Sequence, residues 1–100
     1  MEEQMTLDEL YRVICDRRDN PSDVSYTAML ISKGEDEILK KIGEEAMEVI
    51  IAAKSQGDQR LVEEISDLVY HSLVLIASRG LTPDDIRSEL DNRHKAKRKD

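Results

Sequence analysis

Residues 43–67 read GEEAMEVIIAAKSQGDQRLVEEISD and carry two groups of acidic residues, one on each side of a glycine-containing turn. Both groups have helical spacing, because Glu45 precedes Glu48 by three residues and Glu64 precedes Asp67 by three. Residues three apart lie on the same face of a helix. If the two helices pack side by side, their carboxylates converge, and such a group needs cations or raised pKa values. Lys40 or Lys54 could neutralise one or two of these carboxylates but hardly all of them.

Two of these carboxylates are predicted to face inward. Glu45 lies three residues after Ile42 and four before Val49, in line with the apolar stripe of its helix. Glu64 follows Leu61 by the same three residues. A solvated helix face is the usual explanation for glutamates, but it does not suit positions that a bundle would bury. Burial of an unpaired carboxylate is costly, so the pattern predicts a metal site. Oxygen ligands favour Mg²⁺, with Mn²⁺ as a substitute, over zinc.

The composition favours a helical bundle. The chain of 100 residues has no Trp or Phe and only three Tyr, so its core must come from aliphatic residues and Met. Four Gly and two Pro leave little material for a turn-rich β fold. We therefore expect one all-α domain over residues 1–100, a bundle of four to five helices.

Capping and breaking signals predict where the helices lie. Gly57 suits the left-handed conformation that ends a helix. In the second helix, Tyr26, Met29 and Leu30 are predicted to face inward. The predicted helices run from the Thr6 cap to Arg18, from a Ser22 or Asp23 cap to Lys33, from Asp36 to Ser55, from Asp58 to Ser78, and from the Thr82 cap until the helix frays in the basic residues 95–99.

Residues 68–77, LVYHSLVLIA, are apolar almost all round a helix. A chain of this length has little with which to cover such a helix. We therefore expect a homodimer, or a higher homo-oligomer, in which these helices build a core shared between protomers. The alternative is the central helix of a monomeric bundle.

Charge and cysteine content limit the partners and the compartment. The net charge of -7 argues against a nucleic-acid partner. Cys15 is the only cysteine, which excludes an intrachain disulfide and suits a reducing compartment. No early apolar run resembles a signal peptide, and none is long enough to span a bilayer. We expect a cytoplasmic protein with no membrane partner.

The acidic pattern resembles that of a known group of enzymes. Glu44-Glu45-x-x-Glu48 followed by Glu64-x-x-Asp67 is similar to the paired acidic motif of the MazG-type, all-α nucleotide pyrophosphohydrolase superfamily. The flanking segments narrow the resemblance to the phosphoribosyl-ATP pyrophosphatase family. These segments are SYTA at 25–28, Lys33-Gly34, KKIGEEA at 40–46 and DLVYH at 67–71.

The resemblance extends over about residues 6–93. It implies Mg²⁺-dependent hydrolysis of the α–β phosphoanhydride of phosphoribosyl-ATP to phosphoribosyl-AMP and pyrophosphate, the second step of histidine biosynthesis. It also implies a helical dimer or a higher assembly. This chain is too short to hold the cyclohydrolase domain to which some members of the family are fused.

The resemblance also implies roles for individual residues. The implied metal ligands are Glu45, Glu48, Glu64 and Asp67, and the implied catalytic carboxylates are Glu44, Glu45 and Glu48. Glu44 would be a further ligand or a base that orients water. For the basic candidates among the substrate contacts, ordinary solvated charge is the competing interpretation. The candidate substrate contacts are Ser25, Tyr26, Thr27, Lys33, Lys41, Lys54, His71 and Arg93.

Two other functions stay open at this point. One is a MazG-like pyrophosphohydrolase that acts on free or damaged nucleoside triphosphates, against which the SYTA and DLVYH segments speak. The other is a non-catalytic helical interaction module whose acidic residues are only surface charge. Added Mg²⁺ would stabilise an enzyme with a metal site and would leave such a module unchanged.

Overall fold

The computed structural model describes residues 4–99, and this part of the chain contains helices and no strand. No helix among these residues combines the length and apolar character needed to cross a bilayer. The all-α prediction is therefore confirmed. The helices are α1 (Leu7–Asp19), α2 (Tyr26–Lys33), α3 (Glu35–Ser55), α4 (Gly57–Ser78) and α5 (Pro83–Lys99).

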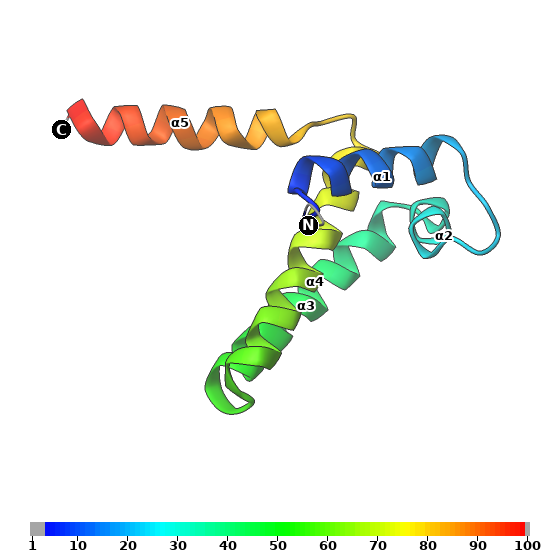
Figure 1. The fold of residues 1–100 in the computed structure, drawn as a ribbon, viewed down its shortest axis with the longest axis horizontal. Helices are drawn as coiled ribbons and strands as arrows, with labels where there is room; N and C mark the ends of the chain where they lie inside the picture. The colour runs from blue at the N-terminus through cyan, green and yellow to red at the C-terminus, as the bar shows by residue number, and fades with distance from the viewer. Residues whose placement is uncertain (1–3, 100) are drawn as a thin grey trace.

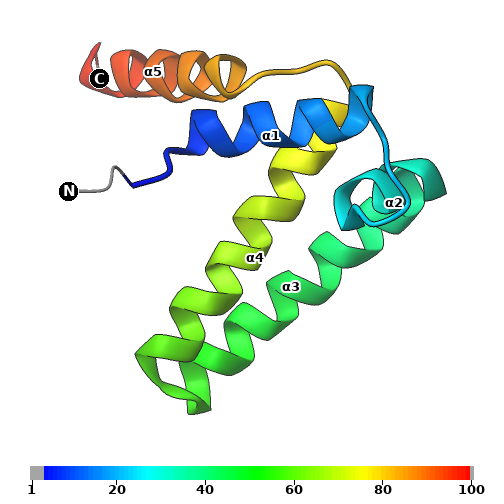
Figure 2. The same ribbon diagram turned by 45° about the vertical axis from the view of Figure 1, so that its right-hand side comes forward.

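The long helices α3 and α4 form an antiparallel hairpin, on which the shorter helices are arranged (Figures 1 and 2). The hairpin turns at Gln56 and Gly57, and Gly57 has the predicted positive φ, at 87°. Helix α1 crosses the carboxyl end of α4, and α2 lies beside the start of α3. Helix α5 extends past α1 and away from the hairpin.

The core lies at the end of the hairpin where α1 and α2 pack. Polar contacts close this end: the Arg18 guanidinium donates to the Ala77 carbonyl at 2.7 Å, and Tyr11 Oη donates to the Leu81 carbonyl at 2.5 Å. The turn end of the hairpin therefore lies outside the main core. The main core residues are Ile14 from α1, Leu30 from α2, Ile38 from α3, and Leu73, Val74 and Ala77 from α4.

Helix α2 begins later than the sequence predicts. Its cap is Ser25, whose hydroxyl accepts a hydrogen bond from the Ala28 amide at 3.1 Å. Ser22 and Asp23 precede the helix in a turn, so neither is the cap. Leu30 is buried as predicted, but Tyr26 and Met29 are 45% and 44% exposed. The inward orientation predicted for Met29 is wrong, whereas the Tyr26 side chain is half in solvent and its hydroxyl reaches His71 of α4.

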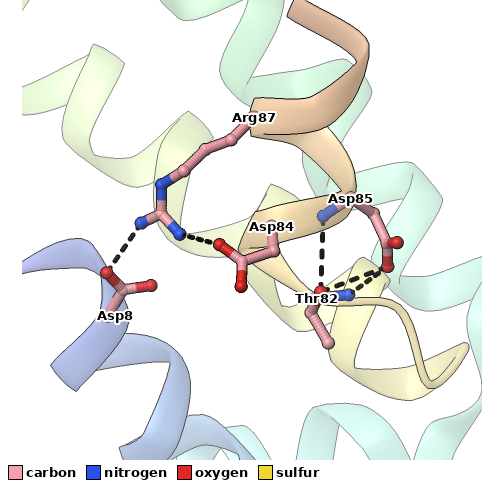
Figure 3. A network of polar contacts seen from close by, with 5 residues as sticks. All are labelled: Asp8, Thr82, Asp84, Asp85 and Arg87. Atoms are coloured by element: carbon pink, nitrogen blue, oxygen red, sulfur yellow. Dashed lines mark hydrogen bonds and ion pairs between the residues drawn. The ribbon is translucent and has the colours of Figure 1, made fainter. Parts of the chain in front are cut away.

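Most other helix boundaries fall within one residue of the prediction, and α5 is the exception. It continues to Lys99, through the basic residues where the sequence predicts fraying. Its start follows the prediction, since the Asp85 amide donates to Thr82 Oγ1 and the Thr82 amide donates to the Asp85 carboxylate (Figure 3). Thr82 is therefore the cap of α5.

An ionic contact joins α5 to α1 (Figure 3). The Arg87 guanidinium contacts Asp8 of α1 and Asp84 of its own helix, both at 2.6 Å. All three side chains are substantially exposed. Every charge in this contact has a partner and access to water.

The apolar segment 68–77 is only partly covered within the chain. Helices α1, α2 and α3 pack against α4 and bury His71, Leu73, Val74 and Ala77, whereas the other six residues of the segment are half-buried. The core shared between protomers stays a prediction. Exposed apolar side chains also lie on α3 and α4 toward the turn. They are Met47, Ile50, Ile51, Val62 and Ile65.

Candidate metal and substrate site

Three carboxylates converge between α3 and α4. Glu45 and Glu48 come from α3 and Glu64 from α4, and each offers an oxygen within 4.8 Å of the other two. The antiparallel packing of the two helices brings these positions opposite each other. We call these three residues the acid cluster.

The acid cluster is partly buried and incompletely paired. The Glu64 side chain is 4% exposed and the Glu45 side chain is 14% exposed. One buried oxygen of each, Oε2, has no hydrogen-bond partner. A buried carboxylate oxygen without a donor is costly, and a divalent cation with oxygen ligands relieves that cost. The residues present therefore fit a hard divalent ion.

The cluster changes the protonation of its own members. Burial raises the pKa of Glu45, and the negative charge of Asp67 acts in the same direction. A protonated Glu48 can donate a hydrogen bond to Glu64, and this bond together with the charges of Glu64 and Glu45 raises the pKa of Glu48 to about 7. Without a cation, the acid cluster therefore retains a proton near neutral pH.

The other two predicted carboxylates lie outside the acid cluster. Asp67 is exposed, although its charge influences Glu45. Glu44 is also exposed, and its carboxylate lies 3.9 Å from the Lys41 ammonium. The sequence predicts four converging carboxylates, and the structure brings three of them together. A metal-ligating role for Asp67 and a catalytic role for Glu44 stay predictions.

The SYTA and DLVYH segments meet in the structure. Tyr26 hydrogen-bonds to His71 at 3.2 Å, and Thr27 hydrogen-bonds to Tyr70. Thr27 is buried and Tyr70 is half-buried. These two contacts fasten the start of α2 to the middle of α4. Ser25 caps α2 at the same place, so residues 25–27 have a structural role. We call the contacts of residues 25–27 with Tyr70 and His71 the joint between α2 and α4.

His71 connects this joint to the acid cluster. Its Nδ1 lies 2.9 Å from the Asp67 carbonyl, to which it must donate, and its Nε2 then accepts from the Tyr26 hydroxyl. The same Nδ1 is 3.9 Å from Glu45 Oε1. Because His71 is buried and both ring nitrogens are engaged within the chain, the geometry favours a positioning role. The predicted substrate contact of His71 stays a prediction.

The basic candidates do not form one group in this chain. Lys33 and Lys54 are exposed in the last turns of α2 and α3. Lys41 faces Glu44, and Arg93 contacts Glu89 on α5 at 2.9 Å. Helix α5 points away from the hairpin that carries the acid cluster (Figure 1). The substrate contacts predicted for these residues stay predictions.

Sequence reasoning missed one charged residue of the site. Arg60 contacts Glu63 and Glu64, each at 2.5 Å, from the first part of α4. The signal was available, because a basic residue four positions before an inward-facing glutamate lies on the same helix face.

Comparison with known proteins matches nearly the whole chain to one family. The family model described as phosphoribosyl-ATP pyrophosphohydrolase matches residues 7–94. A phosphoribosyl-ATP pyrophosphatase of Pelotomaculum thermopropionicum is 56% identical over 97% of this chain and 99% of that relative. Another, of Trichlorobacter lovleyi, is 53% identical over 90% of this chain and 83% of the relative.

A longer relative carries the same sequence as one part of its chain. The histidine biosynthesis bifunctional protein HisIE of Oceanobacillus iheyensis is 54% identical over 81% of this chain, which corresponds to 38% of that relative. The match to the family model spans the acid cluster and the joint between α2 and α4. The chain therefore belongs to the phosphoribosyl-ATP pyrophosphohydrolase family.

Proposed function

We propose that this chain hydrolyses the α–β phosphoanhydride of phosphoribosyl-ATP, giving phosphoribosyl-AMP and pyrophosphate in histidine biosynthesis. Similarity to enzymes of that name over nearly the whole chain supports the substrate. The observation that carries the chemistry is the acid cluster, in which two buried carboxylate oxygens lack partners. A chain that only bound other proteins would have no need of this arrangement.

Glu45, Glu48 and Glu64 would hold a divalent ion, which we propose to be Mg²⁺ with Mn²⁺ as a substitute. Their oxygen-only donor set supports a hard ion. When bound, the ion supplies positive charge that offsets the charge of the substrate phosphates. The proposed ligand set has room for Asp67, whose charge already acts on Glu45.

Glu44 is the carboxylate that we assign to the attacking water. It is exposed, and it lies one helical turn before Glu48, on the same face of α3. Water attacks one phosphorus of the anhydride, the bridging P–O bond breaks, and the phosphate group on the other side of that bond leaves with its electron pair. Glu44 accepts the proton that water releases.

The substrate would lie between the acid cluster and the start of α2. The Tyr26–His71 hydrogen bond supports this, because it places the Ser25–Thr27 segment beside the helix that carries Glu64. Exposed cations around the hairpin would contact the phosphates and the phosphoribosyl group. The proposed cations are Lys33, Lys41, Lys54 and Arg93.

We also propose a homodimer in which the turn ends of two hairpins pack together. The exposed apolar group Met47, Ile50, Ile51, Val62 and Ile65 supports this, since exposed patches of this kind mark interaction surfaces. Light scattering should give twice the protomer mass of 11.4 kDa.

We further propose a cytoplasmic location, which suits a chain whose single cysteine cannot form an intrachain disulfide.

The proposed reaction is tested by the release of pyrophosphate from phosphoribosyl-ATP with Mg²⁺. We expect turnover that EDTA abolishes and that excess Mg²⁺ restores. ATP and other nucleoside triphosphates serve as comparison substrates. If the folded protein cleaves those at equal or higher kcat/KM, the MazG-like alternative is correct, and if it cleaves neither, the proposal fails.

A further inference from the structure

Arg60 makes the only Lys or Arg ion pair with the acid cluster among the described side chains. Its Nη2 lies 2.5 Å from Glu64 Oε1, and its Nη1 lies 2.5 Å from Glu63 Oε1. The other oxygen of Glu63 accepts a hydrogen bond from Gln59 at 3.1 Å. The guanidinium therefore contacts two acids of different exposure: Glu63 is exposed, and Glu64 is almost fully buried.

The contact uses one oxygen of Glu64 and leaves the other without a partner. Oε1 accepts from Arg60, whereas the buried Oε2 has no hydrogen bond. An arginine that filled the place of the cation would occupy the oxygen that lacks a partner. Arg60 instead approaches from the exposed side, with about half of its own side chain in solvent.

Without Arg60, both oxygens of a carboxylate that is only 4% exposed would lack a donor. Such a group turns toward solvent to regain hydrogen bonds, and this movement removes a ligand. Partners that orient a ligating carboxylate typically change metal affinity by about 10- to 100-fold when they are removed. Glu64 therefore depends on Arg60 for the fixed position that a cation requires.

We propose that Arg60 is a positioning residue of the metal site, which fixes the Glu64 carboxylate by one oxygen so that the other is free to bind the ion. This inference rests on the proposed function, because it needs the acid cluster to hold a cation. A simple counter-ion would behave in the opposite way: its positive charge would repel the ion, and its removal would tighten metal binding.

The test measures Mn²⁺ binding to the purified full chain by electron paramagnetic resonance of the free ion, with Mg²⁺ as a competitor. We expect Arg60→Met to weaken Mn²⁺ binding by about 10-fold or more. Arg60→Lys keeps the charge but cannot grip two carboxylates in a fixed fork, so it should recover only part of the loss. Arg60→Met should also lose pyrophosphatase activity at low Mg²⁺, and added Mg²⁺ should restore it. The variant should therefore need more Mg²⁺ for half-maximal activity, while its kcat at saturating Mg²⁺ changes less.

Arg79→Met is the matched control. Arg79 forms the same kind of ion pair with Glu35, at 2.5 Å, at the other end of α4, and its removal should leave Mn²⁺ affinity unchanged. Circular dichroism of each variant checks that it is folded. Unchanged or tighter Mn²⁺ binding in folded Arg60→Met would overturn the inference while the proposed function stands. A wild-type chain that binds no Mn²⁺ would overturn the metal site and this inference together.

Discussion

The acid cluster and the junction between α1 and α5 use carboxylates in opposite ways. At the junction, Arg87 contacts two aspartates, and all of these groups reach solvent (Figure 3). In the acid cluster, three glutamates approach one another, and two of their buried oxygens have no partner. An exposed, paired acid needs no further explanation, whereas a buried and unpaired group indicates a ligand.

The largest effect should come from removing a ligand of the acid cluster. Glu64→Gln keeps the shape of the side chain but takes away the charge that would hold the ion. We expect pyrophosphate release to fall by more than about 100-fold, since loss of a supporting partner alone typically costs up to that much. The assay is turnover of phosphoribosyl-ATP at fixed Mg²⁺. Glu35→Gln, which removes a glutamate paired with Arg79 at the start of α3, is the control, and comparable losses in the two variants would contradict the assignment.

Mg²⁺ should stabilise the folded chain by binding to it and not to the unfolded chain. At about a hundred times the dissociation constant, the gain in unfolding free energy is about 2.7 kcal/mol. Thermal or urea unfolding with and without Mg²⁺ measures it. Glu45→Gln should lose most of the gain, and an equal gain in this variant would place the ion elsewhere.

The pH dependence of stability in the metal-free chain should distinguish a carboxylate of the acid cluster from one in a surface ion pair. Folding raises the pKa of Glu48 from its ordinary value of 4.5 to about 7. Its stabilising contribution is therefore present below pH 4.5 and is lost as the pH rises through 7. Glu35 has the opposite sign, because its hydrogen bond to Arg79 lowers its pKa and its contribution is lost as the pH falls.

Urea unfolding without metal, at pH values from about 5 to 8, tests this sign. Wild-type stability relative to Glu48→Gln should decline across that range, since the glutamine cannot ionise. A difference between the two proteins that stays flat would show that Glu48 does not titrate in the folded chain.

The smallest effect should come from the junction. Asp8→Asn removes one partner of Arg87, but that arginine keeps Asp84 and its water. We expect a loss of less than about 1 kcal/mol in urea unfolding, and unchanged pyrophosphate release. A loss as large as that of a buried pair would end the contrast between the two regions.

Much of this arrangement can be predicted from sequence because helical spacing fixes it. The inward position of Glu45 and Glu64 follows from the apolar stripes, and Gly57 follows from its turn. The choice of Ser25 over Ser22 as a cap does not follow, since several residues of that stretch offer the same hydroxyl or carboxylate signal. Only the packing of α2 against α4 decides among them.

The joint between α2 and α4 and the exposed apolar group depend on tertiary structure in the same way. Nothing local indicates that Tyr26 meets His71, because the residues are 45 positions apart. The apolar segment 68–77 indicates that this part of α4 packs against other helices, but it does not show which helices these are. Arg60 is different, since its spacing from Glu64 is a local signal.

The central claim is that the acid cluster holds the cation. A crystal soaked in Mn²⁺ tests it directly, through the anomalous scattering of the ion. We expect a peak between α3 and α4, within bonding distance of carboxylate oxygens of Glu45, Glu48 and Glu64. A peak at other residues, or no peak at this place after soaking at a saturating Mn²⁺ concentration, would contradict the claim.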